Sequence, residues 1–256
     1  MKRRTMMLGL GALPLLGKMT KAQVPAPYRV SLIDGGFDGA QWHAGVAVAL
    51  DEGWKTYWRM PGEAGIPPQF DWAKSQGAAS IEVLYPVPGR LHDLSGEAVG
   101  YIHRVVFPVV VKPAANPAQA KLRLDLFIAV CKEVCIPANA HAALDLVPGS
   151  ASSAASALID EWVRRVPIAG SPVHSATVTM DGEKPMLLIK LRQRVEDIFV
   201  ETEGPAYFRA PVFSQDGLEV RLIVDNLKDA AGLKGATLKL TLTSGGSGIE
   251  QSVAVN

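Results

Sequence analysis

Cys131 and Cys135 are the two cysteines of the 256-residue chain, and three residues separate them. They follow residues 122–130, an alternating apolar run of the kind typical of a β-strand. Two thiols this close in sequence can act as a redox couple, bind a soft metal ion such as Cu(I), or form a small structural disulfide. The spacing therefore predicts one local chemical site and leaves three chemistries open.

A redox couple uses one thiolate as the nucleophile and the second thiol to resolve the mixed disulfide. The turn of a hairpin can bring two Cα atoms to the ~5.5–6 Å that a disulfide needs. Lys132 favours a thiolate at Cys131 and Glu133 opposes it, so the residues alone do not say which cysteine attacks. A purely structural bridge is a poor use of these cysteines, because closing so short a loop stabilises a fold by only about 2 kcal/mol.

A Cu(I) site is the third reading of the cysteine pair. Thiolates are soft ligands, and His141 is the histidine that follows them in the same strand region, so the ligands would be Cys131, Cys135 and His141. The pattern Cys-x3-Cys-x-Pro also resembles that of the copper-handling Sco proteins, which have a thioredoxin-like fold. This chain lacks the alternation of strands and helices of that fold, and we therefore predict neither a metal nor another cofactor beyond the disulfide itself.

The composition excludes some classes of partner and fold. The formal net charge is +1 and charged residues make up 20% of the chain, so no nucleic-acid partner is expected. Glycine (24) and proline (18) are frequent, which favours short strands joined by turns over long helices.

The N-terminus has the pattern of an export signal. A positive segment, 2–4, precedes an apolar segment, 6–16, and residues 20–22 form an acceptable cleavage site. We predict a signal peptide over residues 1–22 and a mature chain that begins near Gln23. No later segment approaches the ~18 apolar residues of a transmembrane helix, so the mature chain is not expected to span a membrane. Export places the cysteines in an oxidising compartment, where a disulfide persists.

The sequence pattern predicts an all-β fold of two immunoglobulin-like β-sandwich domains joined by a short linker and helix. The domains are expected over residues 23–148 and 171–256, with a linker at 149–170 that contains a helix at 157–165. Strands are expected at 28–33, 42–50, 54–59, 81–84, 101–111, 122–130 and 135–147. Pro108 interrupts the strand at 101–111, which predicts a sheet edge or a bulge there.

Several further motifs accompany the cysteines, in the order Trp54–Pro68, Tyr85-Pro86-x-Pro88-x-Arg90, Gly100-Tyr101, Phe107-Pro108-Val109 and Cys131–Ala138. With them the chain resembles the periplasmic N-terminal domain of DsbD-type thiol:disulfide interchange proteins, and within that family the ScsB branch. The resemblance extends well over residues 28–148 and more loosely over the remainder.

The resemblance implies a thiol–disulfide oxidoreductase of the periplasm, in which Cys131 and Cys135 exchange disulfides. It implies two partners, a membrane-embedded DsbD/ScsB-type electron transporter and periplasmic thioredoxin-like proteins. It places a cap, Leu94, Ser95 and Gly96, over the cysteines and Tyr57 beside them, and it favours Cys135 as the nucleophile.

The chain departs from the family pattern in three respects. DsbD itself has more residues between its cysteines, and Leu94 stands where the DsbD cap has an aromatic residue. The chain ends at Asn256 without the membrane and thioredoxin-like domains of the full-length proteins, so we expect it to dock on a separate transporter or to act on a different partner. Two alternative functions remain, a Cu(I)-binding protein of copper tolerance and an interaction module with a structural disulfide.

Overall fold

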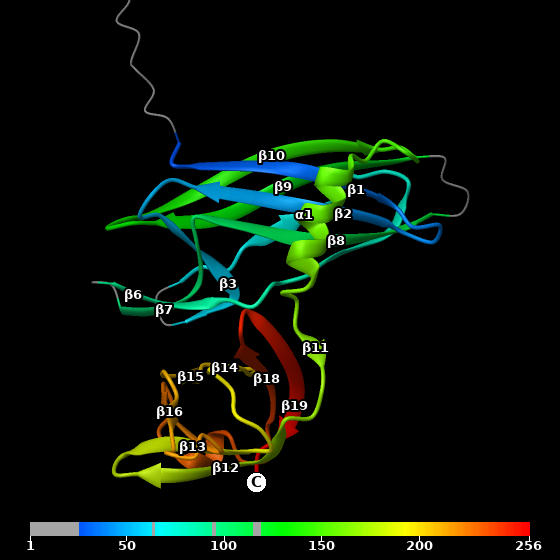
Figure 1. Ribbon diagram of the computed structural model, residues 1–256. Coiled ribbons are helices and arrows are strands. Elements are labelled where there is room, and N and C mark those ends of the chain that lie inside the picture. Colours follow the sequence, from blue (N-terminus) through cyan, green and yellow to red (C-terminus); the bar gives the residue numbers. More distant parts are fainter. Residues whose placement is uncertain (1–25, 63–64, 94–95, 115–118) are drawn as a thin grey trace, which may run out of the picture.

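The computed structural model describes residues 26–62, 65–93, 96–114 and 119–256, and it consists of two β-sandwiches that lie one above the other in Figure 1. This confirms the predicted all-β fold. The predicted signal peptide and the cap residues Leu94 and Ser95 lie outside the described residues. The strands of the first sandwich are β1 (Tyr28–Phe37), β2 (Trp42–Leu50), β3 (Lys55–Gly62), β4 (Gln69–Asp71), β5 (Ala78–Val83), β6 (Gly89–Asp93), β7 (Gly96–Ile102), β8 (Arg104–Pro113), β9 (Ala120–Cys131) and β10 (Cys135–Leu146).

These strands form two packed sheets within the described residues. One has the order β1-β2-β8-β5, and the other has the order β10-β9-β3-β7-β6 with β4 paired to β9. Strict alternation along β9 buries Leu122, Leu124 and Leu126 in the core between the sheets, as the period of two requires. Neighbouring residues therefore point to opposite faces of a sheet. Val130 faces the core between the sheets, and Cys131 lies on the other face.

The segment predicted as one strand at 101–111 is two strands in different sheets. His103 has a positive φ of 60°, a left-handed conformation that turns the chain from β7 into β8. The predicted bulge is absent, because Pro108 faces Gly45 of β2 in regular register, but the predicted edge is present on the other side, where the pairing of β5 with β8 ends at Val83 and Val109. The Pro108 carbonyl accepts from the Leu84 N–H, just past the end of β5. The proline nitrogen faces the same way, so no strand needs its missing N–H.

The helix α1 (Ser153–Val163) lies against β1, β2 and β8 of the first sandwich (Figure 1). Its N-cap is Ser152, whose side chain accepts from the N–H of Ala155. Ile159 and Trp162 are its buried residues. A Cβ at Gly35 of β1 would lie 2.6 Å from the Ile159 Cδ1 and 2.9 Å from the His43 carbonyl oxygen, so a glycine is needed where the helix approaches β1. The helix begins four residues earlier than predicted because the serine caps it inside the segment read as linker.

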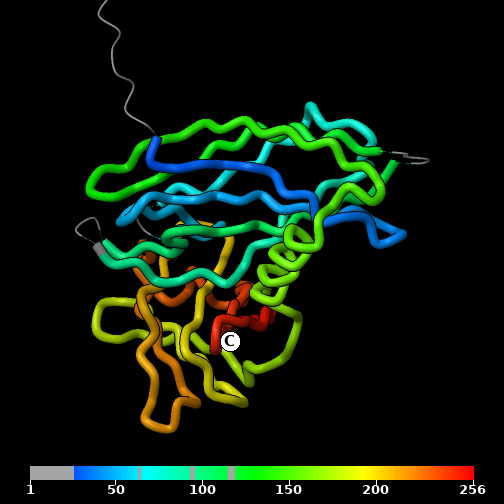
Figure 2. The backbone as a smooth tube through the Cα atoms, turned by 45° about the horizontal axis from the view of Figure 1, so that its top comes forward, coloured from blue at the N-terminus to red at the C-terminus, as the bar shows by residue number. Residues whose placement is uncertain are grey.

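The second sandwich is smaller and lies below the first in Figure 1, and Figure 2 shows the same arrangement from another direction. In the described residues its sheets have the orders β11-β19-β18-β14 and β12-β13-β17-β15, with β16 paired to β17. Its elements are β11 (Ile168–Ala169), β12 (Val173–Asp181), β13 (Lys184–Leu191), β14 (Asp197–Glu201), β15 (Tyr207–Phe208), β16 (Val212–Phe213), β17 (Glu219–Asp225), the 3₁₀ helix η1 (Ala230–Gly232), β18 (Thr237–Ser244) and β19 (Ser247–Ala254).

The two sandwiches share a packed and charged junction. Phe199 of β14 belongs to the core of the first sandwich and meets the Trp58 ring edge-on at 5.7 Å. Arg59 of β3 donates to Glu201 at 2.7 and 2.8 Å and also to Glu250. Because these partners come from both domains and are mostly buried, the junction fixes the domains against each other.

We expect Glu250→Gln to destabilise the protein at neutral pH by about 1–2 kcal/mol. Burial raises the pKa of Glu250, but the hydrogen bonds and charges of Arg59 and Lys239 outweigh burial, so the pKa lies below its usual 4.5. The ionised form is therefore favoured by folding, and its contribution is present above pH 4.5 and is lost as the pH falls through the lowered pKa. Urea unfolding of both forms at pH 7 and at acidic pH should show the difference shrinking on acidification; a constant difference would contradict it.

Candidate functional site

The cysteines face each other at the end of the β9–β10 hairpin. Cys131 is the last residue of β9, Cys135 is the first of β10, and the two pair directly in the antiparallel register. They form a disulfide with their Cα atoms 4.1 Å apart. Residues 132–134 make the turn between them, and Val134 at its end is 72% exposed.

The two sulfur-bearing residues differ sharply in exposure. Cys131 is 1% exposed, whereas Cys135 is an exposed residue, as are Ile136 and Pro137 after it. Since attack on a disulfide needs access to one sulfur in line with the bond, Cys135 offers that access and Cys131 does not.

Tyr57 lies against the disulfide from β3. Lys55 pairs with Cys131, and residues two apart in a strand share a face, so Tyr57 lies on the same face of the sheet as Cys131. The Tyr57 hydroxyl donates to the Cys131 Sγ at 2.8 Å, and it lies 3.4 Å from the Cys135 Sγ. Burial raises the pKa of Tyr57, so the phenol stays protonated and remains a hydrogen-bond donor.

A small apolar cluster encloses the buried side of the disulfide. Tyr57, Ala98, Ala129 and Cys131 form it, and Leu91 packs on its edge. The neighbouring Trp58 points to the opposite face and fills the main core. Because side chains alternate along β3, Tyr57 lies at the disulfide and the adjacent Trp58 lies in the main core.

The β6–β7 hairpin supplies the cover on this side. Leu91 of β6 pairs with Ala98 of β7, and both belong to or contact the cluster around Cys131. Gly96, the described residue of the predicted cap, begins β7 with a φ of 118° and has open space around its Cα. Arg90 of β6 donates to Asp197 at 2.9 and 3.0 Å and to the Ile198 carbonyl, so the second sandwich holds the base of the hairpin.

Lysines flank the site from two sides. Lys132, which the sequence singled out, is exposed and extends toward the Glu52 carbonyl. Lys55 is 6% exposed, and burial lowers its pKa. Lys55 was not predicted; its register opposite Cys131 depends on a long-range pairing with no local signal in the sequence.

The three ligands of the alternative copper site do not come together. His141 lies six residues along β10 from Cys135, about 20 Å at the rise of a strand, and its Nδ1 contacts Asp125 at 2.5 Å. Among residues 26–62, 65–93, 96–114 and 119–256, no group of three or more His, Cys, Asp or Glu side chains has an arrangement that could hold a metal ion. In the same ranges no helix has the length and hydrophobicity to cross a bilayer.

The geometry defines a class of protein, a two-sandwich chain with an asymmetrically exposed disulfide at the tip of a hairpin. Residues 23–146 match the family model for the N-terminal domain of the thiol:disulfide interchange protein DsbD. Residues 165–256 match a domain of unknown function, DUF8393. The first domain of this chain is therefore a DsbD-type N-terminal domain, a thiol:disulfide interchange module.

One solved structure agrees on the fold. The N-terminal periplasmic domain of ScsB from Proteus mirabilis is 22% identical with a TM-score of 0.66, and the match covers 89% of this chain and 92% of that chain. The CupB2 chaperone of Pseudomonas aeruginosa is 9% identical with a TM-score of 0.23 over 84% of this chain and 93% of that chain, too low a score to carry weight. No curated protein matches the chain significantly.

Proposed function

We propose that the chain is a periplasmic thiol:disulfide interchange protein that relays electrons between a membrane-embedded DsbD/ScsB-type transporter and thioredoxin-like proteins. The observation that carries the proposal is the asymmetry of the disulfide. Cys135 is exposed to a partner, while Cys131 is buried and hydrogen-bonded to Tyr57. The membership of the first domain in the interchange family supports the same reading.

In the reductive half-reaction a partner thiolate attacks the Sγ of Cys135. A bond forms between the partner sulfur and Cys135, the Cys131–Cys135 bond breaks, and Cys131 leaves as a thiolate. The Tyr57 hydroxyl donates to this developing negative charge. A second thiolate of the partner then attacks the partner's own sulfur and releases the Cys135 thiolate, so the pair has gained two electrons and the partner carries a disulfide.

The reverse sequence delivers electrons. The Cys135 thiolate attacks a partner disulfide, and the Cys131 thiolate then attacks Cys135 and releases the reduced partner. A structural role explains the pair less well, because β9 and β10 are already joined by an uninterrupted register from Cys135 to Leu146. A disulfide at the end of such a ladder adds little stability.

The test measures the reduction potential of the disulfide in a redox buffer and its exchange with a partner protein. The oxidised chain is equilibrated with glutathione and is then mixed with a reduced thioredoxin-like protein of the periplasm. We expect a potential above about −300 mV and transfer of the disulfide between the two proteins. A lower potential together with no transfer to any such protein would mean a structural bridge and would refute the proposal.

Replacing Tyr57 tests the role of its hydroxyl. Tyr57→Phe keeps the ring in the apolar cluster and removes the donor to Cys131. We expect the reduction of the disulfide by dithiothreitol to slow about tenfold, the equivalent of one hydrogen bond to a charged group at ~1.4 kcal/mol. We also expect the pKa of the Cys131 thiol in the reduced protein to rise, which thiolate absorbance follows. Tyr85→Phe is a control for a half-buried phenol elsewhere, and an equal effect in both variants would rule out a specific role of Tyr57.

A further inference from the structure

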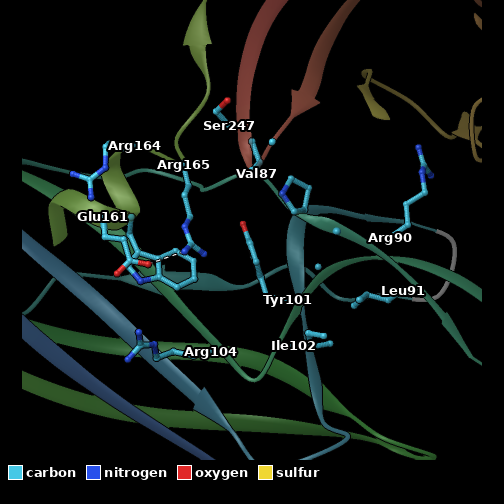
Figure 3. Close-up of a pocket in the computed structure, with 16 residues that line it drawn as sticks. Val87, Arg90, Leu91, Tyr101, Ile102, Arg104, Glu161, Arg164, Arg165 and Ser247 are labelled. Atoms are coloured by element: carbon cyan, nitrogen blue, oxygen red, sulfur yellow. Dashed lines mark hydrogen bonds and ion pairs between the residues drawn. The ribbon is translucent and has the colours of Figure 1, made fainter. Parts of the chain in front are cut away.

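A groove runs from the cysteine hairpin to the junction of the two sandwiches. One hollow, of about 310 Å³, lies at the turn of the cysteine hairpin and is bounded by Trp54, Lys132 and His103. A larger one, of about 900 Å³, lies between the first sandwich, the end of α1 and the β18–β19 turn (Figure 3). Arg90, Leu91 and Ile102 line both hollows. We call the two together the junction groove.

The junction groove is strongly basic, although the chain as a whole is nearly neutral. Its lining carries one acidic residue, Glu161, against six basic ones: Lys55, Arg90, Arg104, Lys132, Arg164 and Arg165. The net charge of the whole chain is +1. The positive charge is thus concentrated along one surface and is balanced by acidic residues elsewhere.

The arginines at the junction end differ in how far they are neutralised. Arg165 pairs with Glu161 at 2.7 Å and stacks over the Trp162 ring, and Arg90 pairs with Asp197. Arg104 and Arg164 are exposed and form no ion pair with any of the residues that the structure describes. In Figure 3 both lie at the α1 side of the hollow. Their charges are therefore available to a ligand.

The groove also offers an apolar surface that reaches the cluster around Cys131. Ile102 is 51% exposed where the two hollows meet. Leu91 lines both hollows and packs on the cluster that contains Cys131. Glu52 and Glu133 flank Lys132 outside the lining, so the excess of positive charge is greatest at the end formed by Arg104 and Arg164.

We propose that the junction groove docks an acidic segment of the protein whose thiol attacks Cys135, with the acidic side chains on Arg104 and Arg164; this rests on the proposed function. A concave surface fits a protein segment better than a flat lipid surface. Complementary charge raises the rate at which partners meet and orients them before the chemical step. The second sandwich thereby becomes part of partner selection, because its β18–β19 turn forms one wall of the groove.

The test uses three reduced peptides of about twelve residues, which can span roughly 40 Å when extended. Each has an acetylated N-terminal cysteine, a Gly-Ser spacer and a tail of glutamate, glutamine or lysine. At low salt we expect the glutamate peptide to reduce the oxidised full chain about tenfold faster than the glutamine peptide, and the lysine peptide to be slowest. The differences should vanish at ~1 M salt, where the Debye length is about 3 Å.

The double variant Arg104→Gln/Arg164→Gln should lose the preference, while its reduction by dithiothreitol stays unchanged. The matched control is Lys112→Gln/Lys228→Gln, which removes the same charge from exposed lysines outside the groove and should keep the preference.

Equal rates for the three peptides, or the same preference in both double variants, would overturn the docking proposal and leave the proposed function standing. A disulfide that resists dithiothreitol and all peptides alike would overturn both. Binding of the wild-type chain to phosphatidylglycerol vesicles, lost in the Arg104/Arg164 variant and without any peptide preference, would assign the groove to a membrane surface and reject a protein partner.

Discussion

Cys131→Ser is expected to form a stable mixed disulfide through Cys135, whereas Cys135→Ser is expected to react very slowly. The reason is the exposure of the two residues, since Cys131 is 1% exposed and is enclosed by Tyr57, Ala98 and Ala129. A buried thiol reacts only after local opening, and an opening free energy of roughly 3 kcal/mol lowers its rate by about 100-fold. The measurement is the rate at which each reduced single-cysteine variant reacts with an aromatic disulfide reagent.

The control for this comparison is the same reaction in urea. Once both variants are unfolded, their thiols should react at similar rates, which shows that the native difference comes from the fold. With a thioredoxin-like protein whose single remaining cysteine is joined to an aromatic thiol as a mixed disulfide, the Cys135 thiolate displaces the aromatic thiol, and a trapped complex should form only when Cys135 is present. Equal rates for the two native variants would show that the asymmetry of the site does not select the attacked sulfur.

Gly100→Ala is expected to destabilise the protein by roughly 3 kcal/mol or more. Gly100 of β7 pairs with Tyr57 of β3, and a Cβ at Gly100 would lie 2.0 Å from the Thr56 carbonyl oxygen and 2.9 Å from the Tyr57 Cα. Both are backbone atoms, so the strands must separate to admit a methyl group. Urea unfolding measures the loss of stability.

The same substitution should loosen the site, because Tyr57 moves with β3 and uncovers Cys131. The reduced Gly100→Ala variant should therefore react with thiol reagents at both cysteines. Gly89→Ala is the matched control, since Gly89 faces Gly100 across the β6–β7 pair but a Cβ there meets nothing closer than 4.0 Å. We expect it to cost less than about 1 kcal/mol. Equal stabilities of the two variants would mean that β3 and β7 do not approach as closely as described.

Much of the fold was predictable because its signals are local. The alternation of 122–130 and the turn at the cysteines identify β9, β10 and the hairpin between them. Pro108 marks a local sheet edge, as a proline within a strand suggests, because β5 has already ended and no neighbouring strand needs the missing N–H. The start of α1 was missed because a serine-rich segment reads equally as a linker or as a helix cap.

The site was predictable in part. The resemblance placed Tyr57 beside the cysteines, and the structure brings its hydroxyl to the Cys131 Sγ. The unequal exposure of the cysteines, the pairing of Lys55 with Cys131, and the contact of Arg90 with the second sandwich depend on residues far apart in the chain. No local pattern encodes such contacts, because they arise only when the two sheets and the two domains pack.

The β9–β10 ladder has a consequence for the oxidised and reduced states of the cysteine pair. We expect the cysteines to remain neighbours through the strand pairing whether or not their sulfurs are joined, since the register continues without interruption to Leu146 and Ala120. We expect the oxidised and reduced backbones to coincide, so little energy is lost to refolding at each turnover. A partner then has to distinguish the two states by the sulfurs themselves, and the reduction potential can be adjusted at Tyr57 without redesigning the sandwich.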